Sequence, residues 1–311
     1  MIKSFLLCLC ALFLISPLGT HADTRESWDL IESENYLVYY RGNVKSAQRV
    51  LDIAEDFHPK MRRLMGDIHL GKIEIWVCEA PSEFQAAVHA PIQDWAIGCA
   101  FPLSRRIVIQ NPRVIVQRDF QLSQVIRHEI VHIVFGQRTQ KAIGKIPRWF
   151  VEGIAIYFSG EWAPRRNDTL MKHIFSKSVI PLADLSQRFP KSENLAQLAY
   201  AESQNAVTWL AETHGVEKLW EIIDRLASGI DLDSAFRDSI GLSLSAFDAK
   251  WRKSLSQRYH WAAMLSSSHL FWGSLALFFL LVYLRYWRYK RRRLRELERE
   301  SEEVDAFFIE R

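Results

Sequence analysis

Three residues within one predicted helical turn could bind a metal ion and activate a water molecule. His128 and His132 stand four apart in His-Glu-Ile-Val-His, and Glu129 follows the first histidine. Because residues four apart share a helix face, both imidazoles can bind one ion while Glu129 reaches a water on it. A catalytic zinc site needs a third protein ligand, and Glu152, in Trp149-Phe-Val-Glu-Gly-Ile-Ala, is the candidate. The pattern predicts one Zn2+ per chain, with Glu129 as the catalytic base.

Two predicted helices must position these ligands. Residues 122–135 are apolar on nearly every side, which predicts a helix buried in the centre of a domain. Two histidines and a glutamate are costly in such a helix unless a metal or hydrogen bonds satisfy them. Pro147 suits the start of a second helix, which carries Glu152 and continues through Tyr157. The competing interpretation is a pair of core histidines beside acids that are there by chance.

The two motifs together resemble the gluzincin metallopeptidases, and most closely the peptidase MA-like family. The resemblance rests on His128-Glu-x-x-His and on Pro147-x-Trp-Phe-x-Glu-Gly-x-Ala, and it extends over about residues 27–255. It implies an α+β, zincin-like domain that hydrolyses peptide bonds in a peptide or protein substrate. Thermolysin-like gluzincins carry an aspartate four residues after the third ligand, whereas this chain has Ile156. The residue that orients a metal-bound histidine is therefore unassigned.

The resemblance implies two further parts of the site. Gluzincins use a tyrosine or histidine downstream of the third ligand to stabilise the oxyanion, and Tyr200 in Tyr-Ala-Glu-Ser is the candidate. An ordinary packed tyrosine is the alternative, and Tyr157 competes for the role. By the same analogy, the strand around Trp95 to Ala100 is expected to line the cleft and to pair with extended substrate.

The apolar periodicity predicts an α+β domain in which a mixed sheet is followed by helices. Strands are predicted at residues 36–40, 72–77, 96–101 and 106–110. Helices are predicted at residues 44–64, 195–213, 216–227, 231–239 and 245–255, besides the two helices that carry the metal ligands. Cys78 and Cys99 are the only cysteines beyond residue 22, and outside the cytoplasm they could form a disulfide or stay as thiols.

Residues 1–22 have the features of a secretory signal peptide. Lys3 supplies a positive charge, residues 5–15 are apolar, and Thr20-His-Ala offers a cleavage site before Asp23. An uncleaved anchor is the alternative. The peptidase domain is expected to occupy residues 23–260.

A second apolar stretch, residues 265–284, contains no Asp, Glu, Lys or Arg and predicts a transmembrane helix. Twenty helical residues span about 30 Å, which matches the core of a bilayer. Seven Lys and Arg residues follow within residues 285–295, so we expect residues 285–311 to form a cytoplasmic tail. The peptidase domain would then lie outside the cytoplasm, on the periplasmic side in a Gram-negative cell, and the chain would contact membrane lipid through this single span.

Ten of the Lys and Arg residues lie outside residues 23–284, nine of them in this tail. The whole chain has 40 Lys and Arg against 36 Asp and Glu, whereas residues 23–284 have 30 against 29. A nearly neutral domain offers no basic face, so no nucleic-acid partner is expected. Two other functions stay open: a non-catalytic binding or scaffold module on a peptidase fold in the cell envelope, and a membrane partner protein that works through its span and tail.

Overall fold

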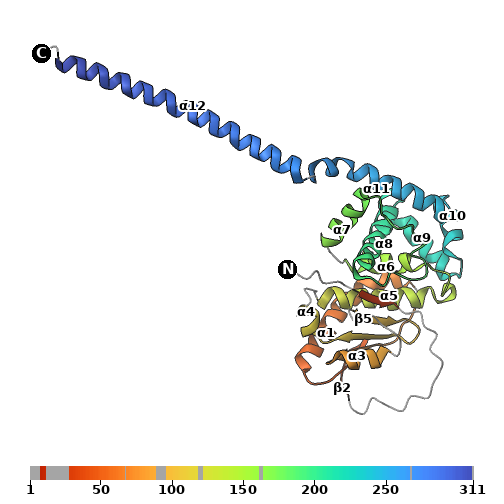
Figure 1. The fold of residues 1–311 in the computed structure, drawn as a ribbon. Coiled ribbons are helices and arrows are strands. Elements are labelled where there is room, and N and C mark those ends of the chain that lie inside the picture. The colour runs from red at the N-terminus through yellow and green to blue at the C-terminus, as the bar shows by residue number, and fades with distance from the viewer. Residues whose placement is uncertain are drawn as a thin grey trace. The chain divides into compact units, whose positions relative to one another are not determined.

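A computed structural model of the chain describes residues 8–11, 28–66, 68–88, 96–117, 122–160, 164–266 and 268–309. The chain divides into two units, Met1–Lys253 and Ser254–Arg311. The first unit holds the sheet and the helices around it, and the second holds the end of α11 and all of α12 (Figure 1).

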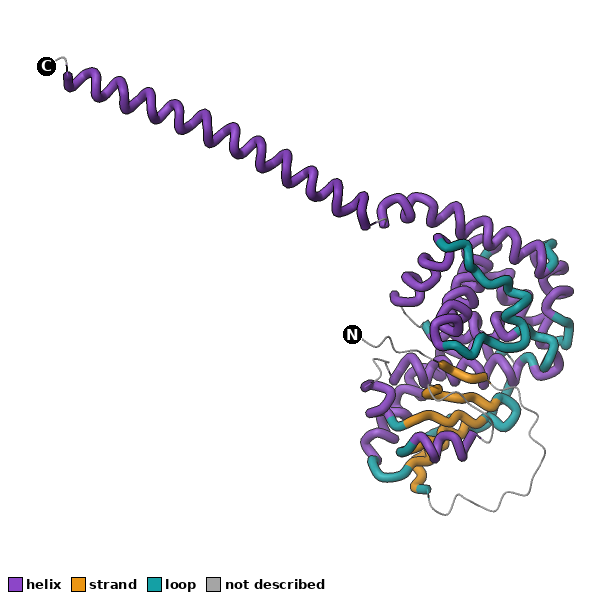
Figure 2. Tube along the Cα trace, in the orientation of Figure 1, coloured by secondary structure: helices purple, strands orange, loops and turns teal. Residues whose placement is uncertain are grey.

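The sheet of the first unit has six strands in the order β1-β5-β6-β4-β3-β2 (Figure 2). They are β1 Cys8–Ala11, β2 Asp29–Glu32, β3 Tyr36–Tyr40, β4 Ile73–Cys78, β5 Ala96–Phe101 and β6 Arg106–Gln110. β3, β4 and β6 are parallel, whereas β5 is antiparallel to β6 and β2 is antiparallel to β3. The predicted mixed sheet is confirmed, and β1 and β2 are strands that the periodicity did not predict.

The helix expected at residues 44–64 is divided in the structure. It consists of α1 Val44–Phe57, a 3-10 turn at His58–Met61 and α2 Arg62–Met65. Pro59 lies in the 3-10 turn, where its missing N–H cannot continue the α-helical hydrogen bonds. Short helices α3 Pro81–Val88 and α4 Pro112–Gln117 follow β4 and β6. α1 packs on β3 and on α5, which in turn contacts β5 and β6.

A helical part follows the sheet, as the sequence predicts. Its members are α5 Leu122–Arg138, α6 Arg148–Ser159, α7 Pro164–Phe175, α8 Glu193–His214, α9 Val216–Ala227, α10 Leu232–Ile240 and α11 Leu244–Ser266. α6 packs against both α5 and α8. An aromatic cluster supports it, since Phe150 lies 6.0 Å from Phe236 and Trp149 lies 6.2 Å from Phe247, measured between ring centroids.

The structure bears on both predicted terminal segments. Within the predicted signal peptide, Cys8–Ala11 form strand β1, while the predicted cleavage position lies outside the described residues. The structure does not support the span predicted at residues 265–284, most of which belongs to α12 Ser268–Ile309. In the described ranges, no helix combines the length and the apolar character needed to cross a membrane.

Candidate metal centre

Two packed helices bring the predicted ligands together. α5 carries His128 and His132 one turn apart, and α6 carries Glu152. α6 begins after Pro147 and ends at Gly160, whose φ of +66° lies in the left-handed region that favours glycine. The apolar neighbours of the histidines are buried all round α5, so the imidazoles face other parts of the protein rather than solvent.

The three side chains converge on one point. The possible ligand atoms of His128, His132 and Glu152 all lie within 4.8 Å of one another. Glu152 Oε2 is 3.5 Å from Nε2 of His128 and 3.4 Å from Nε2 of His132. These distances are long for N–H···O hydrogen bonds. They suit atoms that share an ion, because two ligands about 2.1 Å from a tetrahedral zinc lie roughly 3.4 Å apart.

Burial makes a cation at this point favourable. The exposed fractions of His128, His132 and Glu152 are 0%, 1% and 0%. In the described part of the chain, neither ring nitrogen of His132 and neither carboxylate oxygen of Glu152 has a hydrogen-bond partner. Each unsatisfied buried polar group costs about 1–3 kcal/mol, and a bound metal would satisfy several at once. The donor set therefore fits zinc, which binds imidazole nitrogen and carboxylate oxygen.

Electrostatics favour the metal-binding protonation states of His132 and Glu152. Burial lowers the pKa of His132 by more than the Glu152 carboxylate raises it, so the imidazole stays neutral. Burial alone would raise the pKa of Glu152, but the two imidazoles and Arg148 outweigh it and hold that pKa far below its usual range. A neutral imidazole and an ionised carboxylate are the forms that bind a metal.

Arg148 contacts the third predicted ligand, and sequence reasoning did not identify it. Its Nη2 atom lies 3.4 Å from Glu152 Oε1, one turn away on α6, and its guanidinium carbon lies 5.1 Å from the centre of the Phe189 ring. The buried Ile156 occupies the position at which thermolysin-like gluzincins carry an aspartate. The polar contact of Glu152 comes instead from Arg148, one turn earlier in α6. An Arg-to-Glu spacing of four on a predicted helix was the signal for it.

The two predicted catalytic residues are also buried. Glu129 lies beside His128 in α5 and is 0% exposed. Tyr200 lies in α8, is 1% exposed, and packs edge-on against Phe189 at 4.9 Å between ring centroids. Because Phe189 also lies under Arg148, ring packing connects Tyr200 with the residue that contacts Glu152. Both catalytic roles stay predictions, as does the competing role of the half-buried Tyr157.

A Cys78–Cys99 disulfide is excluded. Both cysteines are buried thiols, and β6 lies between their strands. Two strand spacings amount to about 9.6 Å, whereas a disulfide needs Cα atoms within about 7 Å. Burial raises the pKa of Cys78 to about 12, which makes that thiol a poor nucleophile.

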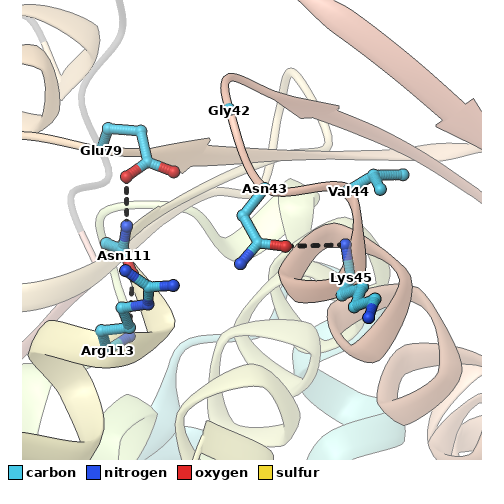
Figure 3. Close-up of a pocket in the computed structure, with 7 residues that line it drawn as sticks. All are labelled: Gly42, Asn43, Val44, Lys45, Glu79, Asn111 and Arg113. Atoms are coloured by element: carbon cyan, nitrogen blue, oxygen red, sulfur yellow. Dashed lines mark hydrogen bonds between the residues drawn. The ribbon is translucent and has the colours of Figure 1, made fainter.

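A separate cavity of about 470 Å3 opens where β3, β4 and β6 end (Figure 3). Its polar groups bind each other, since Asn111 donates to Glu79 and Asn43 Oδ1 accepts from the Lys45 N–H at 3.0 Å. None of the predicted metal ligands lines this cavity. This cavity is therefore distinct from the group of three possible ligands on α5 and α6.

Comparison with known proteins identifies a family for this chain. A family model described as Peptidase MA superfamily matches residues 54–257, which include all three predicted ligands. No curated protein matches the chain. A mutant of an M1 zinc metallopeptidase from Deinococcus radiodurans is similar in structure, with a TM-score of 0.37 and 14% identity over 70% of this chain. The match covers 48% of that protein, so this chain spans about half of its length.

Proposed function

The chain belongs to the Peptidase MA superfamily, and on that premise we propose that it is a zinc-dependent peptidase that hydrolyses peptide bonds in peptides or proteins. The observation that carries this proposal is the convergence of the buried side chains of His128, His132 and Glu152, whose possible ligand atoms lie within 4.8 Å of one another. The described residues contain one such group of three possible ligands, which supports one zinc ion per chain.

Each residue has a distinct part in the proposed reaction. When bound by these ligands, zinc lowers the pKa of water to about 7 and polarises the peptide carbonyl. Glu129 accepts a proton from the attacking water and delivers it to the leaving amine. Tyr200 donates a hydrogen bond to the developing oxyanion. Arg148 keeps the carboxylate of Glu152 ionised and oriented.

The test combines metal analysis of the purified chain with digestion of a peptide library, read by mass spectrometry. We expect about one zinc per chain and a defined cleavage pattern. Glu129→Gln should keep the zinc and lose about 10²- to 10⁴-fold in hydrolysis, since it removes only the base. His132→Ala should lose both zinc and hydrolysis. The exposed Glu193→Gln is the matched control and should change neither.

Three results would speak against this function. Unchanged hydrolysis by Glu129→Gln would remove the base from the mechanism. A chain that binds no zinc would contradict the ligand assignment. Zinc without any cleavage would favour the non-catalytic binding module on a peptidase fold.

The proposal includes a location outside the cytoplasm, on the periplasmic side if the cell is Gram-negative, with the C-terminus inside. The signal-like residues 1–22 and the positive run in residues 285–295 support it. Large apolar side chains of α12 between Trp272 and Leu284 are exposed, and Arg and Lys follow them, a combination that suits contact with anionic membrane lipid.

Cell fractionation tests this location. We expect the chain in the membrane fraction, with a C-terminal epitope digested by added protease in inverted vesicles but not in right-side-out vesicles. Alkaline extraction separates a spanning helix, which stays in the membrane, from surface attachment. Recovery in the soluble fraction would contradict membrane attachment.

A further inference from the structure

The outer edge of β5 is occupied by a segment that lies far away in the sequence. β1 runs parallel to β5, with Leu9, Cys10 and Ala11 paired to Gly98, Cys99 and Ala100. β1 also contacts α5, the helix of the two histidines. Residues of the N-terminal segment thus lie in extended conformation beside both the sheet edge and the metal-binding helix.

A contact at the end of α5 shows which part of that helix lies beside β1. Gln137 Nε2 donates to the carbonyl oxygen of Pro102 at 2.6 Å, which fixes the C-terminal end of α5 beside the end of β5. α5 follows β6 and therefore returns in the direction of β5. Along α5, His132 and His128 precede Gln137 by roughly 7.5 and 13.5 Å. Along β5, the same lengths correspond to about two and four residues before Pro102. These are the β5 residues with which β1 pairs.

The site is closed in this arrangement. His128, Glu129 and His132 are at most 1% exposed, and all six residues of β5 are buried. A peptide cannot reach Glu129 unless a neighbouring element moves away. A free strand edge binds extended peptides through main-chain hydrogen bonds, and β1 already uses that edge of β5.

We propose that Cys8–Ala11 is an internal blocking strand, which occupies the edge of β5 beside the metal ligands and keeps extended peptides from the site. The blocking part of this inference rests on the proposed peptidase function, whereas the occupancy of the edge does not. The partner that the edge fits is a short extended strand of small and apolar residues, here Cys-Leu-Cys-Ala. Cleavage after Ala22, as the sequence predicts, would remove the strand and open the site.

Two natural cysteines allow the occupancy to be tested in the full chain. Cys10 and Cys99 are Cα partners, and neighbouring strands about 4.8 Å apart fall within the Cα distances that a disulfide bridges. Diamide, a two-electron oxidant, takes one hydrogen from each thiol and leaves the S–S bond. Peptide mapping without reductant should then find Cys10 linked to Cys99.

Matched variants make this result specific. Cys10→Ser should abolish the link, whereas Cys8→Ser should retain it, because Cys8 pairs with Ala96. Cys78 should stay reduced, since β6 separates it from β5. Absence of the Cys10–Cys99 link, or equal linkage through Cys8, would overturn the occupancy of the edge by β1.

The same sample tests the blocking. The oxidised, zinc-loaded chain should hydrolyse peptides at least about tenfold more slowly than the reduced chain, and reductant should restore the rate. Cys10→Ser should not respond to the oxidant. A linked chain that hydrolyses peptides at the reduced rate would overturn the blocking role. If neither form hydrolyses peptides, the peptidase function and with it the blocking role fail, and the disulfide alone decides whether β1 occupies the edge.

Discussion

Glu152 is an ionised carboxylate with no solvent exposure, and its neighbours decide its charge. The imidazoles of His128 and His132 lie on one side and the guanidinium of Arg148 on the other. Removing one partner from a buried charged group leaves the remaining charge uncompensated, which is costly. Arg148 therefore contributes to the metal site without being a ligand.

Arg148→Gln should weaken zinc binding roughly 10- to 100-fold, the effect typical of residues that support metal ligands. The reason is that Glu152 loses the positive charge that favours its ionised form. Competition with a fluorescent chelator measures the affinity, and Arg49→Gln, at an exposed position of α1, is the control. Equal affinities for the wild type and Arg148→Gln would show that Arg148 does not support the ligand.

Gly153 allows α6 and α8 to approach closely next to the third ligand. A Cβ atom at this position would lie 2.5 Å from the carbonyl oxygen of Ser203 and 2.6 Å from Cγ2 of Val207. Gly153→Ala should therefore lower the free energy of unfolding by about 1–3 kcal/mol, the usual cost of overpacking. Urea denaturation measures it. Gly273→Ala, with no atom within 4 Å of the added Cβ, should cost nothing, and similar losses in both variants would contradict the steric explanation.

At the scale of elements, two helices hold the loop between α7 and α8, which contacts the first turn of α6. Glu202 of α8 accepts from the N–H of Ile180 at 2.9 Å, and Asp248 of α11 accepts from the N–H of Leu182 at 3.4 Å. Two carbonyl oxygens further along this loop accept from the first N–H groups of α6, at 2.7 and 3.2 Å. This loop therefore connects α8 and α11 through hydrogen bonds to α6, the helix that carries the third ligand.

Glu202 should make stability depend on pH. Burial, together with the charge of Asp248, raises the pKa of Glu202 to about 8. The folded chain therefore keeps a proton that the unfolded chain releases above about pH 4.5. The contribution of this proton to the free energy of unfolding is fully present below about pH 4.5. It is lost as the pH rises from about 4.5 to about 8, and the loss amounts to up to about 5 kcal/mol.

The isosteric variant checks this assignment. Glu202→Gln keeps an oxygen for the Ile180 N–H but cannot ionise, so its free energy of unfolding should stay flatter between pH 5 and 8.5. At pH 8.5 the variant should be more stable than the wild type. Urea denaturation across this range measures both, and parallel pH curves for the two proteins would exclude Glu202 as the source.

Elements with strong local patterns could be predicted from the sequence, and elements defined by distant partners could not. Alternation and apolar runs predicted β3 to β6, and the spacing of His128, His132 and Glu152 predicted the metal group. β1 and β2 have only four residues each, and they form strands because they pair with neighbouring strands rather than because of their own sequence pattern. The contact of Arg148 with Phe189 depends on a loop path that no periodicity describes.

At the scale of the whole molecule, the proposed zinc joins helices from two parts of the first unit. α5 packs on the sheet, whereas α6 packs on α8, and the ligands come from both α5 and α6. An ion that binds only the folded chain stabilises it, by about 2.7 kcal/mol at a free concentration 100 times its Kd. Binding of the proposed zinc would therefore be coupled to the packing of the helical part on the sheet.

Removal of zinc by a chelator should lower the Tm, and added zinc should restore it. Calorimetry measures both midpoints. The His132→Ala variant should melt at the same temperature with and without zinc, because it lacks a ligand. A wild-type Tm that does not respond to zinc would contradict a site formed by the folded chain.

The two apolar segments show that composition alone does not determine which structure an apolar segment of this chain adopts. Residues 5–15 and 265–284 are both predominantly apolar, yet four residues of the first form a sheet strand and residues 268–284 of the second lie in α12. A short apolar run does not distinguish a buried strand from a membrane-directed segment. The pairing of β1 with β5 requires residues that no local window contains.

The same pairing sets an order of events during synthesis. Ala96 follows its partner Cys8 by 88 residues, which at roughly 5–20 residues per second takes about 4–18 s. For that time the apolar segment around Cys8 has emerged while β5 does not yet exist. A targeting factor that recognises apolar N-terminal segments therefore meets residues 8–11 before β5 has been synthesised. Whether the segment is exported or pairs with β5 then depends on the relative rates of the two events rather than on their equilibrium affinities.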